Sequence, residues 1–401
     1  MPANVSSDYI YLDYAATAPL CEEAARAMAP YQVPGRVNLA VGGNANSLHS
    51  PGRAAFEAME AARKTVARCL GARRPDEVVF TSGATEADDA VLFGVAKAER
   101  DRRRRAGAGD FTPHVVVSAI EHDAVLHPAK RLERQGFRVS YLAPDARGFV
   151  SPAALERVID EDTVLVSVQM ANSEVGSIQP VAELARVAHD AGSLFHTDAV
   201  QALGKTPVDV SALDVDAASF SAHKIGGPKG VGALYLRTRT PFDAFILGGG
   251  QESGRRSGTQ NVAGIAGFAA ACEAAVANLE EESARLRLLR DRLYAGLAAF
   301  GPVSPTVSVE GGSADFLPNI VHVLVDGLES ETMILRLDMA GIGVSGGSAC
   351  SSHSLEPSHV LKAMGVSGDR AYGALRISMG RYTVDSDVEA LLSAMQGVLD
   401  W

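Results

Sequence analysis

A lysine stands among small polar residues in the segment Ser219–Gly227 (SFSAHKIGG), after an apolar run. Lys224 is either a solvated turn residue or a reactive amine. An amine near apolar groups or other cations has a lowered pKa and can form a Schiff base with a carbonyl cofactor. Ser221 and His223 are side chains of the kind that bind phosphate. The segment therefore predicts a covalent cofactor site at Lys224, with Ser221 and His223 as phosphate ligands.

A carboxylate closes an earlier strand-like run, in the segment 196–205 (HTDAVQALGK). An aspartate such as Asp198 at the end of a buried strand is often a helix cap. A pyridoxal ring, however, acts as an electron sink only while its nitrogen is protonated, and an adjacent carboxylate maintains that state. Asp198 and Lys224 end two successive runs, so they suit one pyridoxal ring. Gln201, one turn after Asp198, is a weaker candidate for the same ring.

The segment Phe80–Val91 (FTSGATEADDAV) predicts a strand, a tight glycine turn and a helix. The backbone N–H groups of Ala84 and Thr85 and the Thr85 hydroxyl would lie at the helix start, where an anion is favoured. A simple helix cap is the alternative. Because pyridoxal phosphate needs a phosphate anchor of this kind, the three segments together predict pyridoxal 5'-phosphate as the cofactor.

Two further polar residues each follow a predicted strand. His122, in SAIEHDAV, suits stacking on an aromatic ring, or it is a histidine satisfied by hydrogen bonds in the core. Asn172, in QMANSEVGSIQP, suits donation to a ring oxygen, or it shapes the turn. Each signal is weak when taken alone.

A cysteine lies in a run of glycines and serines within Gly343–Gly365. Most free cysteines are buried hydrophobic residues, but Cys350 has no large apolar neighbour in sequence, which favours an accessible nucleophile. In ALRISMGRYT, Arg376 is either a bidentate clamp for a substrate carboxylate or part of an ion pair between domains. Together these groups predict an amino-acid substrate whose amine condenses with the cofactor and whose side chain is attacked by the thiol.

Short β-rich runs alternate with helical patterns between about residues 77 and 237. The runs are 77–82, 114–120, 163–170, 193–200, 217–223 and 232–237. This alternation predicts a mostly parallel sheet with helices on both faces and a ligand site beyond the carboxyl ends of the strands. After about residue 264 the pattern changes to one or two helices within Ile265–Phe300, a strand in NIVHVLV and a helix near Val384–Leu399. The change predicts a second, smaller α+β domain.

Composition and charge limit the class of protein. The 401 residues have a net charge of -11, and the basic run Arg100–Arg105 is predicted to be a solvated turn, because nucleic-acid binding needs a broad basic face. No apolar stretch approaches the roughly 20 residues of a membrane helix, and the N-terminus lacks a secretory pattern. We therefore expect a cytoplasmic protein without a membrane or nucleic-acid partner. The spacing of the four cysteines argues against a metal site and a disulfide framework.

Nine motifs occur in order along nearly the whole chain. They are YLDYAATAPL, SGATEADDAV, EHDAV, MANSEVGSIQP, HTDAVQALGK, SFSAHKIGGPKGVGALY, GGGQESGRRSGTQNVAGI, GSACSSHSLEPSHVLKAMG and LRISMGR. With these motifs the chain resembles the cysteine desulfurases of the nitrogen-fixation and iron-sulfur assembly type, which are class V aminotransferases among the fold-type I pyridoxal phosphate enzymes. The resemblance implies an α/β fold with a large domain over residues 16–262, built on a seven-stranded sheet, and a small domain formed by 1–15 and 263–401.

The resemblance also implies an activity. A homodimer with active sites at its interface would convert L-cysteine to L-alanine, with Lys224 as Schiff-base lysine and proton carrier. The sulfur would remain as a persulfide on Cys350, for delivery to an acceptor such as an iron-sulfur scaffold or a tRNA-thiolation protein.

The resemblance assigns roles to the remaining candidates. His122 would stack on the cofactor ring and carry protons, while Asn172 and Gln201 would contact the ring hydroxyl. Thr259 of the other subunit would complete the phosphate site. Arg376, together with Asn172, would bind the substrate carboxylate.

Four positions depart from the family pattern, namely Ser173, Ser253, Gln260 and His353. His353 stands three positions from Cys350, so it bears on the thiol and on acceptor docking. Two related activities remain open, those of a selenocysteine lyase and a cysteine sulfinate desulfinase of the same fold. A scaffold within a sulfur-transfer assembly is the alternative outside enzymes, and the intact set of Lys224, Asp198, Cys350 and Arg376 argues against it.

Overall fold

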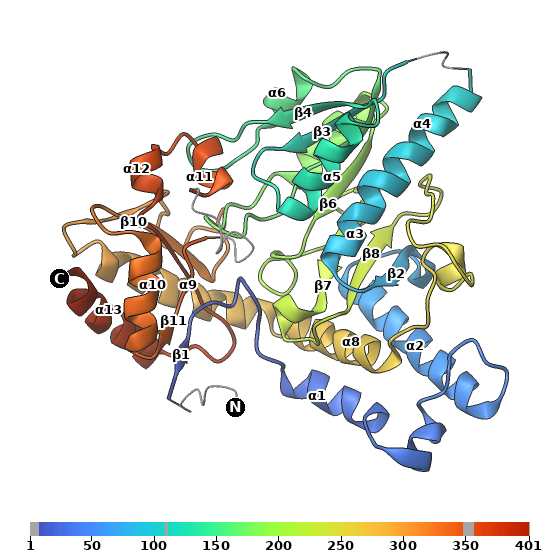
Figure 1. The fold of residues 1–401 in the computed structure, drawn as a ribbon, viewed down its shortest axis with the longest axis horizontal. Helices are drawn as coiled ribbons and strands as arrows, with labels where there is room; N and C mark the ends of the chain where they lie inside the picture. The colour runs from blue at the N-terminus through green and yellow to red at the C-terminus, as the bar shows by residue number, and fades with distance from the viewer. Residues whose placement is uncertain (1–7, 108, 110, 348–356, 401) are drawn as a thin grey trace.

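A seven-stranded sheet forms the centre of the computed structural model, which describes residues 8–107, 109, 111–347 and 357–400 (Figure 1). The strands are β2 Val78–Thr81, β3 His114–Ser118, β4 Arg138–Leu142, β5 Thr163–Ser167, β6 Leu194–Asp198, β7 Ala217–Ser221 and β8 Gly232–Leu236. They lie in the order β2-β8-β7-β6-β5-β3-β4, and β8 runs antiparallel to both neighbours while the other pairs are parallel. The predicted, mostly parallel α/β sheet is confirmed.

Both faces of this sheet are buried. Val115 and Val117 of β3 pack into a hydrophobic cluster on one face, and Val116 packs into a second cluster on the other. The alternation follows from the strand geometry, which points successive side chains to opposite sides. Burial on two faces explains why the central strands are recognisable as continuous apolar runs.

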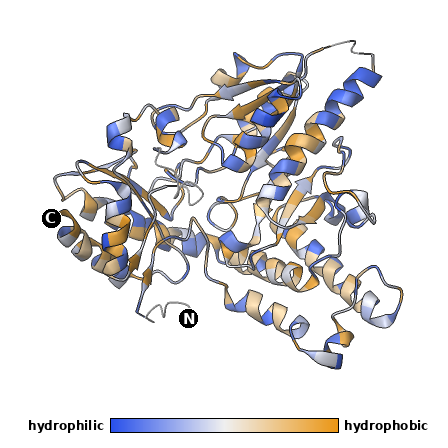
Figure 2. Ribbon diagram, viewed as in Figure 1, coloured by the Kyte–Doolittle hydropathy of each residue, from blue (hydrophilic) through white to orange (hydrophobic). Residues whose placement is uncertain are grey.

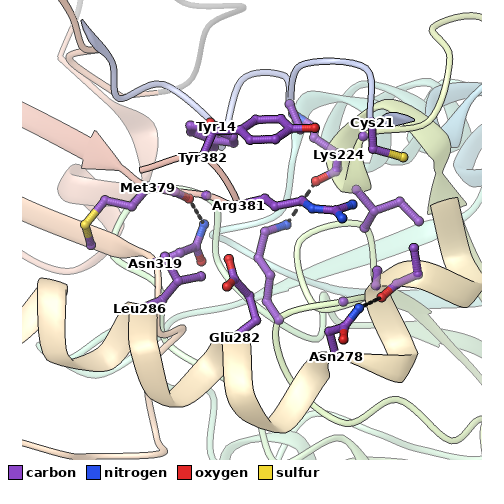
Figure 3. A pocket seen from close by; sticks show the side chains of 18 of the residues that line it. Tyr14, Cys21, Lys224, Asn278, Glu282, Leu286, Asn319, Met379, Arg381 and Tyr382 are labelled. Carbon is purple, nitrogen blue, oxygen red and sulfur yellow. Dashed lines mark hydrogen bonds between the residues drawn. The ribbon is translucent and has the colours of Figure 1, made fainter. Parts of the chain in front are cut away.

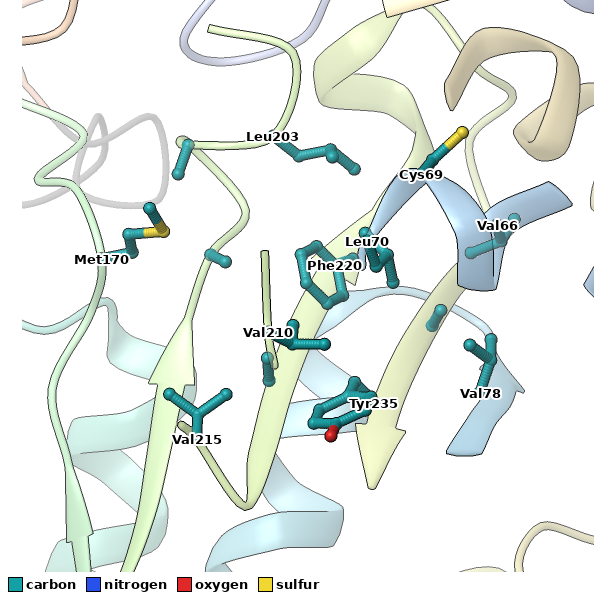
Figure 4. Close-up of a cluster of buried hydrophobic side chains, with 14 of the residues drawn as sticks. Val66, Cys69, Leu70, Val78, Met170, Leu203, Val210, Val215, Phe220 and Tyr235 are labelled. Carbon is teal, nitrogen blue, oxygen red and sulfur yellow. The ribbon is translucent and has the colours of Figure 1, made fainter. Parts of the chain in front are cut away.

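Helices cover the two faces, with their apolar sides turned inward (Figure 2). The helices on the first face are α3 Ala84–Ala90, α4 Ala96–Arg105, which is joined to α3 by a π-helical segment Val91–Val95, and α5 Asp123–Glu133. Those on the second face are α2 Ser50–Cys69, α6 Pro152–Glu156, α7 Val181–Asp190 and α8 Val262–Ala277. Figure 4 shows part of the second cluster, where Leu70, at the end of α2, lies beside Phe220 of β7.

A second sheet of three antiparallel strands, in the order β12-β10-β9, forms the core of the C-terminal region with three helices packed on it. These elements are β9 Val303–Pro305, β10 Ile320–Val325, β12 Ala374–Ser378, α9 Leu279–Leu297, α10 Ser330–Met339 and α13 Asp385–Leu399.

Near the N-terminus, β1 (Ile10–Tyr11) pairs in parallel with β11 (Ile342–Gly343). The remaining helices are α1 Glu22–Met28, α11 His359–Ala363 and α12 Gly368–Ala371. Short 3-10 segments occupy η1 Ala29–Tyr31, η2 Gly35–Ala40, η3 Pro75–Glu77, η5 Ala222–Ile225 and η6 Glu252–Gly254.

The long helical pattern predicted within Ile265–Phe300 is two helices. α8 ends at Ala277, and α9 begins at Leu279 at an angle of 71° to it. Within the described ranges, no single helix has the length and apolar composition needed to cross a membrane, and α8 and α9 meet that test only as this bent pair.

A buried ion pair ties α2 to the segment that follows the sheet. The Arg63 guanidinium donates to both carboxylate oxygens of Glu252, at 2.6 and 2.9 Å, and also to the Val78 carbonyl at 2.7 Å. Glu252 in turn accepts from the Phe80 backbone N–H at 2.9 Å, and it has a positive φ of 50°. The pair therefore fixes the start of the loop that leads to Thr259.

We expect Glu252→Gln to lower the free energy of unfolding by about 3 kcal/mol, because it breaks a buried pair and leaves the Arg63 guanidinium with Glu60, a partly exposed carboxylate bound at 2.9 Å, as its remaining counter-ion. Denaturant unfolding measures the change. The matched control is Glu22→Gln, which breaks the exposed pair between Glu22 and Arg26 and should cost less than about 1 kcal/mol. Equal losses of unfolding free energy in the two variants would contradict the larger contribution expected of the buried pair.

Candidate active site

A cavity of about 530 Å³ lies beyond the carboxyl ends of the central strands and brings most of the predicted residues together. Nine of them line it: Ala84, Thr85, His122, Asp198, Gln201, Ser221, His223, Lys224 and Arg376. Asp198 and Ser221 are the last residues of β6 and β7, and Ala84 begins α3 directly after β2. This is the edge at which open α/β sheets bind ligands.

Lys224 lies in η5, which follows β7 directly and has Gly226 as its C-cap residue. Gly226 has a φ of +80°, and a side chain there would also approach Cys21 and the Pro19 carbonyl. The Lys224 Nζ donates to the carbonyl oxygens of Ala15 (2.6 Å) and Ala16 (2.8 Å). The N-terminal segment therefore holds the amine at the wall of the cavity, although sequence analysis had not assigned these carbonyls a role.

Asp198 is a buried carboxylate at the end of β6. Its Oδ1 accepts from the Val200 backbone N–H at 2.9 Å. Burial raises the pKa of Asp198, while the Val200 hydrogen bond and the nearby His122 and Lys224 oppose that rise. A cation in the cavity beside Asp198 would favour its ionised form.

The start of α3 faces the same cavity. Gly83 is its N-cap residue, no side chain of the described residues caps it, and a Cβ placed on Gly83 would meet no atom within 4 Å. The helix continues through the π-helical segment into α4, so its N-terminus carries a full helix dipole. Ala84 and Thr85 thus lie at an anion-favouring position on the cavity wall.

His223 is held at the cavity edge by the N-terminal segment. Its Nδ1 lies 3.1 Å from the Thr17 hydroxyl, and the Ala18 backbone N–H donates to its carbonyl at 2.9 Å. Burial, together with the charges of Lys224 and Lys229, lowers the pKa of His223 to about 4. The ring is therefore neutral at pH 7 and can donate one hydrogen bond without bringing a further charge.

His122 caps α5 with its own side chain. Its Nδ1 accepts from the Ala124 backbone N–H at 3.1 Å. In the neutral ring the proton must then be on Nε2. His122 therefore combines the capping role with a place on the cavity wall.

Asn172 and Thr259 are not among the residues that line the cavity. The Asn172 Oδ1 accepts from the backbone N–H groups of Glu174 and Val175, both at 2.9 Å, and its Nδ2 donates to the Ile120 carbonyl at 3.2 Å. These contacts are those of a residue that shapes the turn, which was the alternative to donation to a ring oxygen. Thr259 is exposed. The ligand contacts expected of Asn172 and Thr259 stay predictions. Cys350 and the neighbouring His353 lie outside the described residues.

Arg376 is almost fully buried on β12. Its Nη2 donates to Asp13 at 2.8 Å, its Nη1 donates to the Ser173 carbonyl at 3.0 Å, and its Nε has no partner among the described residues. The pair with Asp13 joins the N-terminal segment to β12, and both residues lie within the predicted small domain, so it is not the pair between domains that the alternative expected. Since Arg376 also lines the cavity, the same contacts orient it toward a ligand.

His322 of β10 stands directly across from Arg376 of β12. Its Nδ1 lies 2.7 Å from the Thr306 hydroxyl. Burial, followed by the charge of Arg376, lowers the pKa of His322 to about 3. The ring therefore stays neutral in the folded protein beside the guanidinium.

This histidine predicts a loss of stability in acid. Below pH 6.5, the ordinary pKa of histidine, the unfolded chain binds a proton at His322, whereas the folded protein binds that proton only near pH 3. The free energy of unfolding therefore falls as the pH drops from 6.5 toward 3. Between pH 7.5 and pH 5, His322→Gln should lose about 2 kcal/mol less unfolding free energy than the wild type. Urea unfolding at both pH values measures this difference. His127→Gln, which removes an exposed ring, is the control and should follow the wild type.

Two buried acids near Asp198 were not predicted as site residues. Both carboxylate oxygens of Asp88 on α3, and the Oε2 of Glu121, are buried with no hydrogen-bond partner in the described part of the chain. Burial and then the charge of Asp198 raise the pKa of Asp88 well above its usual range, and burial raises that of Glu121 to about 8. Asp88 stands in the predicted helix start, where its spacing alone could not distinguish it from a cap residue.

No group of three or more histidine, cysteine or acidic side chains is positioned to hold a metal ion within the residues that the structure covers.

The family described as aminotransferase class V matches residues 10–391 of the chain. The chain is 42% identical to the cysteine desulfurase IscS of Methanosarcina thermophila over 398 residues, which are 99% of this chain and 94% of that relative. Among solved structures, a NifS-like protein is similar with a TM-score of 0.87 and 38% identity, covering 98% of this chain and 99% of the other. SspA in complex with cysteine is similar with a TM-score of 0.77 and 32% identity, covering 94% and 100%. These likenesses agree with the resemblance that the motifs indicated.

Proposed function

We propose that this chain, which belongs to the class V aminotransferase family, is a cysteine desulfurase that converts L-cysteine to L-alanine with bound pyridoxal 5'-phosphate. Members of the family are pyridoxal phosphate enzymes. The observation that carries the proposal is the meeting of Lys224, Asp198 and Arg376 at one cavity, because these groups provide an amine, a carboxylate and a guanidinium for cofactor and substrate.

The cavity residues fit the cofactor. Asp198 is a buried carboxylate that a protonated ring nitrogen would stabilise, and the Gln201 Oε1 is a buried acceptor with no partner in the described ranges, which suits the ring hydroxyl. The helix start at Ala84 suits the phosphate, with Thr85, Ser221 and His223 around it. When bound, pyridoxal phosphate stabilises negative charge at the substrate α-carbon.

The remaining chemistry belongs to side chains of this protein. Lys224 would hold the cofactor covalently, and its Nζ would take the α-proton of the substrate. His122 moves a proton at its Nε2, because its Nδ1 is occupied by the Ala124 N–H. Arg376, oriented by Asp13 and Ser173, binds the substrate carboxylate.

We assign the sulfur to Cys350 on sequence grounds. Its thiolate attacks the substrate sulfur, the carbon–sulfur bond breaks, and the electron pair of that bond remains with the carbon skeleton, which is protonated to alanine. We further propose a homodimer in which Thr259 of each subunit completes the phosphate site of the other. An iron-sulfur scaffold or a tRNA-thiolation protein is the proposed acceptor class.

The test is incubation of the purified protein with L-cysteine, with and without a reductant. We expect alanine and sulfide in equal amounts with reductant, and one added sulfur atom on the Cys350 peptide by mass spectrometry without it. Cys350→Ser should bind the cofactor and give neither product. Undiminished sulfide release by this variant would reject Cys350 as the sulfur acceptor.

The alternatives of selenocysteine lyase and cysteine sulfinate desulfinase are separated by comparing rates on the three substrates. A desulfurase should be fastest on cysteine and should require Cys350. A protein that is faster on selenocysteine or on the sulfinate, and that tolerates Cys350→Ser, would instead be a member of one of those classes.

A further inference from the structure

A second cavity, of about 330 Å³, meets the first at Lys224, which lines both (Figure 3). Its walls come from the N-terminal segment, η5, α8, α9 and the residues after β12. Figure 3 shows Glu282 of α9, Asn319 and Arg381 directed into it from different elements. The function proposed above uses Lys224 from the first cavity and leaves this second cavity without a role.

Lys205 brings an incompletely paired cation to this cavity. It is 8% exposed, and its Nζ makes one long hydrogen bond, 3.4 Å to the Lys224 backbone carbonyl, among the contacts of the described residues. Burial, followed by the charge of Lys224, lowers the pKa of Lys205 to about 7. A buried ammonium in this situation is stabilised by an anion placed beside it.

The two arginines at the cavity are already paired, and the Lys224 Nζ donates to the Ala15 and Ala16 carbonyls. Arg285 binds both carboxylate oxygens of Glu282 at 2.8 and 2.9 Å, and Arg381 binds both oxygens of Glu23 at 2.8 and 2.9 Å. Lys205 is therefore the cation best placed to receive an external carboxylate.

An unused acceptor accompanies the unused cation. Asn319 is fully buried, and its Nδ2 donates to the Met379 carbonyl at 3.2 Å. Its Oδ1 has no partner in the part of the chain that the structure describes. A ligand with both a carboxylate and a hydrogen-bond donor would satisfy Lys205 and Asn319 together.

The rest of the wall favours a small ligand. Apolar side chains make up much of it, namely Ala18, Pro19, Ile225, Ala271, Ala274, Ala275 and Leu286. A methyl-sized side chain would contact such a surface without leaving a polar group unpaired. The cavity volume of about 330 Å³ is sufficient to hold a molecule as small as alanine.

We propose that this second cavity binds a small aliphatic α-amino acid, with its carboxylate at Lys205 and its ammonium group at Asn319. The site is separate from the substrate site at Arg376, and Lys224 forms part of both walls. An amino acid bound there contacts the residue on which turnover depends, so the site couples amino-acid concentration to the state of Lys224. The identification of alanine as the relevant ligand rests on the proposed function, since alanine is the product of that reaction.

Binding is linked to protonation of Lys205. A carboxylate favours its ammonium form, so affinity for the amino acid should decrease as the pH rises from 6 to 8. The other charged and titratable groups at the cavity are Tyr14, Cys21, Lys224, Glu281, Glu282, Arg285, Arg381 and Tyr382. The charges of Glu282, Arg285 and Arg381 are compensated within the pairs described above.

The test is calorimetric titration of L-alanine into the holoenzyme after borohydride has fixed the cofactor to the protein, so that alanine cannot react with it. We expect saturable binding that weakens at least about tenfold in Lys205→Met, because a hydrogen bond to a charged group is lost. Asn319→Leu should also weaken binding, and propionate, which lacks the ammonium group, should bind more weakly than alanine. Lys130→Met, on the exposed face of α5, should leave binding unchanged.

Two outcomes would overturn the proposal. The first is no binding of alanine, and the second is binding that Lys205→Met leaves intact, which would place the amino acid in the first cavity. Lys205→Gln is a second variant in case the methionine variant does not fold, and the visible cofactor band before reduction monitors folding in both. Loss of the visible cofactor band on reduction reports the cofactor linkage separately, so failure of the proposed function is distinguishable from failure of this site.

Discussion

Lys224→Ala is expected to lower kcat/KM for desulfuration of L-cysteine by at least about 10⁴-fold, because one side chain provides both the covalent attachment of the cofactor and the proton transfer at the substrate α-carbon. The carbonyls of Ala15 and Ala16 hold the Nζ at the cavity wall, and an alanine at position 224 has no amine to place there. Steady-state assays of alanine formation measure the loss.

The matched control for this variant is Lys130→Ala, which removes an exposed lysine of α5 and should retain full activity. A second measurement follows the attachment itself. Borohydride reduction of the wild type, followed by peptide mapping, should place the cofactor on the Lys224 peptide. Turnover that survives in Lys224→Ala, or attachment to a different lysine, would overturn the assignment of the whole site.

Much of the fold could be predicted from the sequence because the strands buried on both faces are continuous apolar runs. Six of the seven strands of the main sheet fall within the predicted runs. The exception is β4 at the sheet edge, where Arg138 and Tyr141 are exposed and Leu142 is buried. An edge strand with polar and charged residues lacks the apolar run on which the prediction depended.

The site could be predicted wherever a reactive residue type closes a strand. Asp198, Ser221 and Lys224 come directly after apolar runs, and parallel strands bring such positions to one edge. Contacts from distant segments could not be predicted. The N-terminal segment brings to the site the carbonyls of Ala15 and Ala16 and the carboxylate of Asp13. Because every residue has a backbone carbonyl, residue types do not indicate which carbonyls contact the site.

The second cavity could not be predicted from the sequence either. Lys205 belongs to a motif that the sequence analysis used for Asp198, but its burial depends on α9, which packs over it through the bond from the Ser283 hydroxyl to the Lys205 carbonyl at 2.9 Å. Sequence alone favours a solvated lysine at such a position. Its lack of an ion pair among the described residues is a property of the packed structure.

Asp198→Asn is expected to lower kcat/KM by about 10² to 10³-fold while the cofactor remains bound, since it removes one preorganised charge that stabilises the reacting system. The asparagine keeps the size of the side chain and can still accept from the Val200 N–H, so the fold at the end of β6 is preserved. Burial raises the pKa of Glu121 to about 8, so Glu121 is mostly protonated at pH 7 and does not replace the lost charge, and burial also raises the pKa of Asp88.

This account of the acids is tested by two companion variants assayed beside Asp198→Asn. Asp88→Asn should have a much smaller effect on kcat/KM, because Asp88 lies on α3 rather than at the end of β6, and burial raises its pKa and so disfavours its charged form. Asp190→Asn, an exposed position at the end of α7, should match the wild type. If Asp88→Asn were the more damaging change and Asp198→Asn retained activity within about threefold, the negative charge that holds the ring nitrogen protonated would belong to α3, and the assignment of β6 as the strand that supplies it would be wrong.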